Sequence, residues 1–439
     1  MAEKSDRKTK KEIFYERVYV ETPVDTDGDG RYDLIAVYIW RPKSTLSGEK
    51  VPVIYAADPY LMPCNADWYV PYDVNQELRT YPSQDIDEKD IRFDFSKEPI
   101  YTAEKIRVSS GCVGSVPCAE AENLEGINPI YSYFNDRGYA CVFCGGLGTK
   151  GSEGFTLTGS REEILAFRSV IDWLCGRCRA FSNKTDNIEV RADWCTGKVA
   201  MTGKSYVGTM CIGVAATGVE GLKTIIPEAG ISNWYNYYRC NGLVVSPLGC
   251  QGEDLDLLAG FCFSRAKDSG DYAQVRDRYS EELKKIAESE DRNSGNYNLF
   301  WDQRNYLNQI KNFRASVFII HGLNDWNVKT NQCIPLFQAL EKAGVERKLF
   351  LHQGGHIHVY KLKNAGVLSM LERWLEHYLK DVDNGIENEP KVLVESNIEQ
   401  SLWFTSETWP PEGWSYVDFP IIASETGDRC IITDDLSAT

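Results

Sequence analysis

Residues 197–216 read GKVAMTGKSYVGTMCIGVAA, an apolar strand-like run that enters a glycine-flanked turn and leaves it as an apolar helix. The turn, from Gly203 to Gly208, has the pattern G-x-S-x-G with Ser205 at its centre. Because a sharp strand-to-helix turn crowds the backbone, its flanking positions need glycine, and the serine hydroxyl projects at the carboxyl edge of a sheet. The alternative is a tight turn that happens to contain serine.

Strand-like and helical runs alternate on both sides of this turn. Residues 138–146 are typical of a buried strand, and residues 161–174 of a helix with Ser160 as its N-cap. After the turn come strand-like runs at 221–229, 316–322 and 348–355, and helical runs near 330–343 and at 368–381. This α/β alternation predicts a mostly parallel, twisted sheet with helices on both faces.

Two segments depart from the alternation and suggest a division into domains. Residues 235–308 are rich in charge and in helix-forming residues, which predicts a helical cap. The cap would be inserted into a catalytic domain made of residues 1–234 and 309–386. Residues 387–439 hold a few strand-like runs, and we expect them to be the start of a C-terminal β-sandwich or jelly roll that is cut short.

A serine hydroxyl is a weak nucleophile until a base accepts its proton, so the five histidines are the next candidates. His321 and His377 are typical of structural residues in a strand and in a helix. Of the remaining three, His352, His356 and His358, we predict that His356 is the base, because it follows two glycines on the loop after a strand. The three could instead bind a metal, but the glycine pair breaks the helix that their spacing would need.

The acid that orients the base should follow the preceding strand. Asp325 lies just after residues 316–322, which gives the order Ser205, Asp325, His356 that α/β-hydrolases share. The Tyr206 amide, at the start of the helix after the serine, would face a developing oxyanion. For Asp325 alone, a turn-forming Asn-Asp pair is the simpler interpretation.

Four motifs resemble those of the Xaa-Pro dipeptidyl-peptidases, serine peptidases related to cocaine esterase. They are GKSYVGTM (203–210), ISNWYNYYR (231–239), GEDLDLLA (252–259) and HGLNDWNVK (321–329). They occur in the order and with the spacing of that family, and the resemblance covers most of residues 15–420. Family members usually carry a further N-terminal domain and a complete C-terminal β-sandwich, so the chain departs from the family pattern at both ends.

The resemblance implies roles for further residues. The Tyr60 hydroxyl would join the Tyr206 amide in the oxyanion hole, and the triad would again be Ser205, Asp325 and His356. Glu253 and Asn327 would bind the ammonium group of a substrate. The ring of a penultimate proline would be surrounded by Trp234, Tyr237 and Val328. Taken individually, Glu253 and Trp234 are typical of a solvated charge and a core aromatic residue.

Composition limits the kinds of partner that the protein is expected to bind. The net charge of −16 disfavours binding to nucleic acid, and no run of eighteen apolar residues or signal peptide is present. We therefore expect a cytoplasmic protein whose fourteen cysteines are mostly buried thiols. The expected partner is a small peptide with a free N-terminus, and a homodimer is compatible with the sequence.

No cofactor or metal is expected. The acidic loop that begins at Asp25 lacks the glutamate that a calcium loop needs at Ala36, and a turn between strands explains it better. The glycine-rich stretch 146–151 is not followed by a helix, so we interpret it as a loop. The predicted activity is release of Xaa-Pro dipeptides. An esterase, amino-acid ester hydrolase or acylase on the same scaffold, and an inactive interaction module, are the alternatives.

Overall fold

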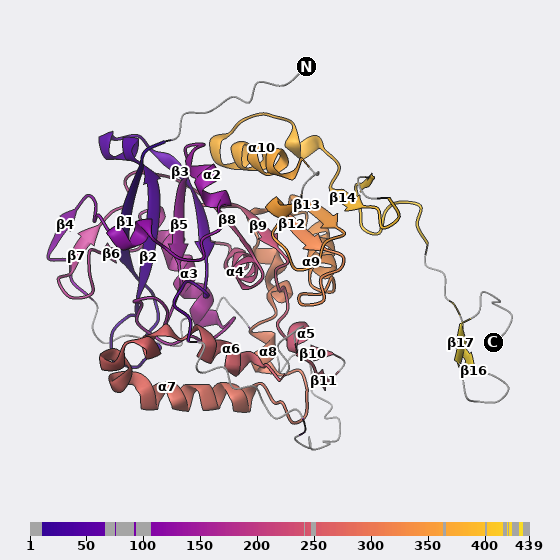
Figure 1. Ribbon diagram of the computed structural model, residues 1–439, viewed down its shortest axis with the longest axis horizontal. Helices are drawn as coiled ribbons and strands as arrows, with labels where there is room; N and C mark the ends of the chain where they lie inside the picture. The colour runs from indigo at the N-terminus through magenta and orange to yellow at the C-terminus, as the bar shows by residue number, and fades with distance from the viewer. Residues whose placement is uncertain are drawn as a thin grey trace.

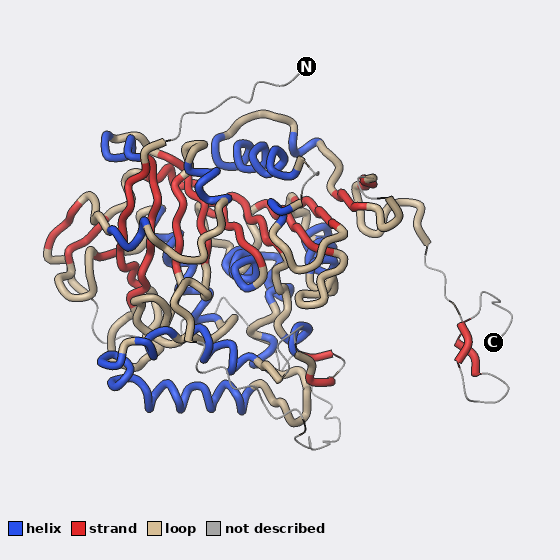
Figure 2. The backbone as a smooth tube through the Cα atoms, in the orientation of Figure 1, coloured by secondary structure: helices blue, strands red, loops and turns tan. Residues whose placement is uncertain are grey.

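The computed structural model describes residues 11–65, 75, 92–93, 107–240, 242–246, 252–362, 366–399, 402–415, 419, 421–423 and 430–432 (Figure 1). Within this part of the chain one large twisted sheet has helices on both faces (Figure 2). Among the described helices, none combines the length and the apolar character that crossing a membrane requires.

The large sheet contains thirteen strands in the order β15-β14-β13-β12-β9-β8-β3-β5-β2-β1-β6-β7-β4. Seven neighbouring strands, from β14 to β5, run parallel. The strands are β1 (Ile13–Glu21), β2 (Leu34–Pro42), β3 (Val51–Ala57), β4 (Gly111–Val113), β5 (Ala140–Cys144), β6 (Ala180–Phe181), β7 (Ile188–Val190), β8 (Cys195–Lys204), β9 (Leu222–Glu228), β12 (Ser316–Gly322), β13 (Arg347–His352), β14 (Val392–Glu395) and β15 (Trp403–Ser406).

The central strands are apolar because both of their faces are covered. In β3 all seven residues are buried, with Val53 and Tyr55 packing into one core and Ile54 and Ala56 into the other. This alternation follows from the two-residue period of a strand. Sheets covered on both sides need such continuous apolar runs.

The helices form a layer on each face. On one side lie α3 (Arg161–Leu174), α4 (Tyr206–Ala215) and α9 (Cys333–Lys342); on the other lie α2 (Ile130–Asn135) and α10 (Val367–Lys380). The predicted cap of α3 is confirmed, since the Ser160 side chain accepts the Glu163 N–H at 3.2 Å. The parallel sheet with helices on both faces is likewise as predicted.

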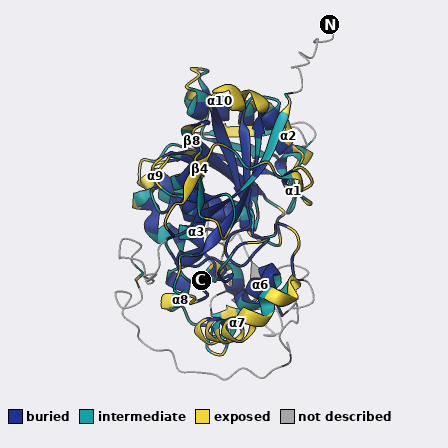
Figure 3. Ribbon diagram, turned by 90° about the vertical axis from the view of Figure 1, so that its left-hand side faces the viewer, coloured by how far each residue is buried: buried dark blue, intermediate teal, exposed yellow. Residues whose placement is uncertain are grey.

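The chain between β9 and β12 forms a separate group of helices below the sheet in Figure 1. It contains α5 (Tyr235–Tyr238), α6 (Leu255–Cys262), α7 (Ser269–Ser289) and α8 (Leu299–Asp302), with the short strands β10 (Arg239–Cys240) and β11 (Leu243–Val244). Buried Asp254 accepts hydrogen bonds from Arg239 and Arg292 within this group. The outer side of α7 is exposed (Figure 3).

After α10 the chain returns to the sheet edge. β14 pairs parallel to β13, and β15 pairs antiparallel to β14. Two further strands, β16 (Ile421–Ala423) and β17 (Cys430–Ile432), pair only with each other among the described residues. The short α1 (Ala119–Glu122) precedes α2 in the chain. The domain boundaries expected from the sequence stay predictions.

Candidate active site

Ser205 lies on a strained turn between β8 and α4. Its backbone has φ 63° and ψ −125°, a conformation that residues other than glycine rarely adopt. Close packing leaves no room for a side chain at either of the two flanking glycines. A Cβ atom on Gly203 would lie 2.2 Å from Val207 Cγ1, and one on Gly208 would lie 2.8 Å from the Gly203 carbonyl oxygen. The G-x-S-x-G pattern is therefore the sequence that this turn permits.

Hydrogen bonds hold the turn at the carboxyl edge of the sheet. The Ser205 N–H donates to the Glu228 carbonyl at 2.9 Å, which ties the turn to the end of β9. The Ser205 carbonyl accepts the N–H and the hydroxyl of Thr209 at 2.8 and 2.9 Å. With its backbone bonded in this way, Ser205 stands at the N-terminus of α4, where the positive end of the helix dipole favours a developing negative charge.

Asp325 and His356 form a hydrogen-bonded pair at the same edge, on the loops after β12 and β13. Asp325 Oδ2 lies 2.7 Å from His356 Nδ1. The other carboxylate oxygen accepts the N–H groups of Asn327 and Val328, each at 2.9 Å. The Asp325 side chain has no exposed surface. Three hydrogen bonds thus fix the orientation of the carboxylate, and through it that of the imidazole.

The serine and the histidine line one cavity. It has a volume of about 460 Å³, and its walls include Asp58, Tyr60, Asn128, Ser205, Glu228 and His356. We call it the Ser205 cavity. Lys204, the residue before the serine, donates from Nζ to the His356 carbonyl at 3.3 Å. The three predicted triad residues are therefore brought together at the ends of β8, β12 and β13, with the histidine bonded to the acid and facing the same space as the serine.

The two residues predicted to supply the oxyanion donors, Tyr60 and Tyr206, are in contact through their rings. The ring of Tyr60 meets the ring of Tyr206 edge to face, with centroids 5.5 Å apart. The Tyr60 N–H donates to Asp58 Oδ1 at 3.0 Å, which fixes the segment after β3. Burial raises the pKa of the Tyr60 hydroxyl, so it remains a proton donor throughout the neutral range.

Two of the five predicted substrate-binding residues, Trp234 and Tyr237, belong to one aromatic cluster that includes Tyr206. The Trp234 ring lies 5.1 Å from that of Tyr206, and it also packs against Tyr237 and Tyr238. The Tyr237 hydroxyl donates to Asn327 Oδ1 at 2.7 Å. We call Tyr206, Trp234, Tyr237 and Tyr238 the aromatic cluster. It connects the serine turn to the loop of the acid.

Burial differs among these predicted residues. Trp234 and Val328 are fully buried, whereas Tyr237 and Asn327 are half-buried. Glu253 is 6% exposed and accepts a hydrogen bond from the Tyr238 hydroxyl at 2.5 Å. The structure thus places the carboxylate of Glu253 against the aromatic cluster. This buried contact departs from the solvated charge that the residue taken alone would suggest.

Two residues near the site were not predicted from the sequence. Tyr238 holds Glu253, and Glu163 lies beneath the serine turn, where it accepts the Tyr206 hydroxyl at 2.8 and 3.0 Å and the Gly159 N–H at 2.6 Å. Burial raises the pKa of Glu163 to about 7. Glu163 lies in the first turn of α3, and local sequence does not show what packs against that turn.

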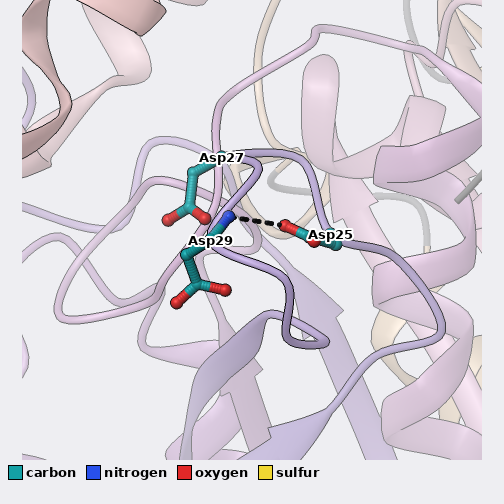
Figure 4. Close-up of side chains that lie close together, drawn as sticks. All are labelled: Asp25, Asp27 and Asp29. Atoms are coloured by element: carbon teal, nitrogen blue, oxygen red, sulfur yellow. Dashed lines mark hydrogen bonds between the residues drawn. The ribbon is translucent and has the colours of Figure 1, made fainter. Parts of the chain in front are cut away.

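The acidic loop before β2 brings three carboxylates close together (Figure 4). Asp25, Asp27 and Asp29 have carboxylate oxygens within 4.8 Å of one another. Asp25 accepts the Asp29 N–H at 3.2 Å, and buried Asp27 pairs with Arg265 at 2.7 Å. The loop lies between the antiparallel strands β1 and β2, where a turn was predicted. Arg265 therefore offsets part of the negative charge of these carboxylates.

Comparison with known proteins adds an independent line of evidence. The model of the X-Pro dipeptidyl-peptidase (S15) family matches residues 27–358. A Xaa-Pro dipeptidyl-peptidase of Pediococcus pentosaceus is 39% identical over 432 residues, covering 98% of this chain and 52% of that protein. One of Lactiplantibacillus plantarum is 40% identical over 407 residues, covering 92% and 49%. The chain spans about half the length of the curated relatives it matches.

Solved structures share the fold at lower sequence identity. A CocE/NonD family hydrolase from Staphylococcus aureus has a TM-score of 0.57 and 15% identity, covering 96% of this chain and 64% of that one. An α-amino acid ester hydrolase has a TM-score of 0.50 and 17% identity, covering 93% and 60%. These similarities confirm the predicted α/β-hydrolase fold and carry no argument about substrate.

Proposed function

Because the chain belongs to the X-Pro dipeptidyl-peptidase (S15) family, we propose that it is a serine peptidase that releases Xaa-Pro dipeptides from the N-terminus of peptides. The observation that carries the proposal is the hydrogen-bonded Asp325–His356 pair, which faces the same cavity as a serine held at φ 63°. A serine with a base and an acid in this order is the arrangement used for acyl transfer.

In the proposed reaction Ser205 Oγ attacks the carbonyl carbon that follows the proline. His356 Nε2 takes the hydroxyl proton, and Asp325 stabilises the imidazolium that results. The Tyr206 N–H and the Tyr60 hydroxyl donate to the oxyanion of the tetrahedral intermediate. When the C–N bond breaks, His356 returns the proton to the leaving amine. Water, activated by the same histidine, then hydrolyses the acyl-enzyme.

The limit of two residues would be set by recognition of the substrate's N-terminus. Glu253 and Asn327 would bind the ammonium group, because a carboxylate shielded from water pairs strongly with a cation. The proline ring would lie against Tyr237, with Trp234 and Val328 forming the wall behind it. An aromatic surface suits a compact apolar ring. A blocked N-terminus would leave Glu253 without its partner.

The test is hydrolysis of Ala-Pro and Gly-Pro p-nitroanilides by the wild type and by the Ser205→Ala variant. We expect turnover by the wild type and a loss of roughly 10⁵-fold or more in kcat for the variant. If the wild type hydrolyses amino-acid esters but neither anilide, the ester hydrolase alternative replaces this proposal. Equal turnover by wild type and variant would exclude Ser205 as the nucleophile.

We also propose that the protein acts in the cytoplasm. Support comes from its cysteines, which include fully buried thiols such as Cys144, whose pKa burial raises to about 12. Thiols of this kind are unreactive packing residues, as expected in a reducing compartment. Cell fractionation tests the location. Whether two copies form a dimer stays a prediction that sedimentation can test.

A further inference from the structure

The wall of the Ser205 cavity and the aromatic cluster share no residue among those that the structure describes. None of Trp234, Tyr237, Glu253, Asn327 or Val328 is among the described residues that line the cavity. Tyr60 stands between the two regions, since its ring packs against Tyr206 and it also lines the cavity. If the dipeptide occupies the cluster, the part of the substrate beyond the scissile bond has the cavity as its space.

Charged groups in the cavity wall are mostly carboxylates. Asp58 follows β3, Glu228 ends β9, and Glu125 lies exposed near α2; against these three the wall has one lysine, Lys204. The neighbouring parallel strands β3, β8 and β9 bring Asp58 and Glu228 to either side of the serine turn. The cavity is therefore a region of negative potential beside the reacting bond.

Hydrogen bonds orient the two inner carboxylates from behind. Asp58 Oδ1 accepts the Tyr60 N–H at 3.0 Å, and Glu228 Oε2 accepts the Val359 N–H at 2.8 Å. Each carboxylate still has further lone pairs for a ligand. Glu228 is 5% exposed, so its charge is poorly shielded by water, and a cation entering the cavity would gain more there than at the surface.

Besides His356, two basic groups in the described part of the wall lie near the carboxylates. His358 Nδ1 lies 3.2 Å from the Asn128 amide nitrogen and 3.8 Å from Glu228 Oε2. Lys204 donates to the His356 carbonyl, and burial lowers its pKa. Both groups offset part of the negative charge of Asp58 and Glu228.

The ionisation of Asp58 determines the pH range in which the cavity wall carries most negative charge. Burial raises the pKa of Asp58 to about 6, while the Tyr60 N–H and His358 oppose part of that rise. The carboxylate is therefore ionised above neutral pH and becomes protonated below pH 6. An assay at pH 8 and low salt examines the cavity in its charged form, with little screening.

We propose that the Ser205 cavity binds the first residue of the leaving peptide and selects a cationic side chain, lysine or arginine, through Asp58 and Glu228. The inference rests on the proposed function, because it needs the dipeptide on the other side of Ser205. A cavity of about 460 Å³ is in the size range of small-ligand sites. The amine released on cleavage would then leave through a site that recognises the side chain of its own residue.

The experiment compares the peptides Ala-Pro-Lys-Ala, Ala-Pro-Gln-Ala and Ala-Pro-Glu-Ala at pH 8, with Ala-Pro-p-nitroanilide as a leaving group that lacks a side chain. We expect kcat/KM to fall in the order Lys, Gln, Glu, with about tenfold or more between the first and the last. Glutamine matches glutamate in size, so the difference between these two reports charge alone.

Two substitutions connect the preference to the cavity. In Asp58→Asn and in Glu228→Gln the remaining carbonyl oxygen can still accept the backbone N–H, and each variant should reduce the Lys-to-Glu ratio several-fold. Because the ratio is taken within one variant, a general loss of activity does not affect it. The control is Glu253→Gln, which should weaken all peptides alike and leave the ratio unchanged.

The results separate this inference from the function on which it rests. If the anilide is cleaved but the ratio is near one, or if it stays unchanged in both folded cavity variants, the cavity proposal is wrong and the peptidase proposal stands. Preference for glutamate would also overturn it. If no Ala-Pro substrate is cleaved, both proposals fail together.

Discussion

Two regions near Ser205, the aromatic cluster and the Ser205 cavity, are built from different chemistry. On one side the aromatic cluster is closely packed, and its carboxylate, Glu253, is held by the Tyr238 hydroxyl. On the other side the Ser205 cavity is open space with Asp58 and Glu228 in its wall. Under the proposed function, the cluster side would accept a short group of fixed size. A charged cavity can accept many groups and rank them by charge.

This difference separates two tasks of a peptidase. Under the proposed function, the acyl side would determine where the peptide is cut, which requires fixed distances from the N-terminus to the scissile bond. The leaving side would determine which peptides are cut fastest, which requires only a graded preference. Changes at the triad should affect both sides equally, whereas changes within one side should alter only that part of the specificity.

Among variants that keep both the serine and the histidine, the largest effect is expected for Asp325→Asn. An asparagine cannot orient the imidazole or stabilise it once charged, so kcat should fall about 10⁴-fold. Because the triad serves both sides, the loss should be equal for all Ala-Pro substrates, whatever their leaving group. Steady-state kinetics with the anilide and the three peptides measures this. A loss confined to some leaving groups would contradict the common role of the pair.

A smaller effect, limited to the acyl side, is expected for Glu253→Gln. Losing one charge-assisted contact with the ammonium group should reduce kcat/KM for Ala-Pro-p-nitroanilide by about 10- to 100-fold. The N-acetylated anilide, which lacks the ammonium group, should react equally slowly with both proteins. Glu288→Gln, an exposed change on α7, is the matched control. Equal kinetics of wild type and Glu253→Gln would remove Glu253 from the substrate site.

The smallest effect is expected on the stability of the fold, through Glu163, which lies beneath the serine turn. Glu163 has a pKa raised to about 7 by burial, so the folded protein holds a proton that the unfolded chain releases above about pH 4.5. This contribution to stability is complete below pH 4.5 and is lost as the pH rises through 7. Urea unfolding at pH 5 and pH 8 measures it.

For the wild type, relative to Glu163→Gln, the free energy of unfolding should decrease by on the order of 2 kcal/mol between pH 5 and pH 8. The variant serves as the reference because glutamine keeps the shape and does not titrate. Parallel pH dependence of the two proteins would show that Glu163 does not carry the raised pKa, and would weaken its assignment as the group that supports Tyr206.

Sequence reasoning succeeded where local sterics determine the structure. The pattern around Ser205 permits only one kind of turn, and the order of Ser205, Asp325 and His356 along the chain follows from the way parallel strands place their loops at one edge. The α/β-hydrolase fold follows from the same alternation of strands and helices. These features need only neighbouring residues and the general rules of parallel sheets.

Sequence reasoning was less informative where contacts join segments that are distant in the chain. Glu228 ends β9 and Asp58 follows β3, and they border one cavity because β8 lies between these strands in the sheet. Nothing in the local sequence of either residue shows that adjacency. Tyr238 and Glu163 were missed for the same reason, since each acts through a partner that tertiary packing supplies.

The central claim is that Ser205 is a nucleophile activated by the Asp325–His356 pair. The most direct measurement is labelling of the native protein with a fluorophosphonate, followed by mass spectrometry of its peptides. The account predicts one adduct, on Ser205, that is absent from Ser205→Ala and forms far more slowly in His356→Ala. An unlabelled wild-type protein, or an adduct on another residue, would contradict it and favour the inactive interaction module.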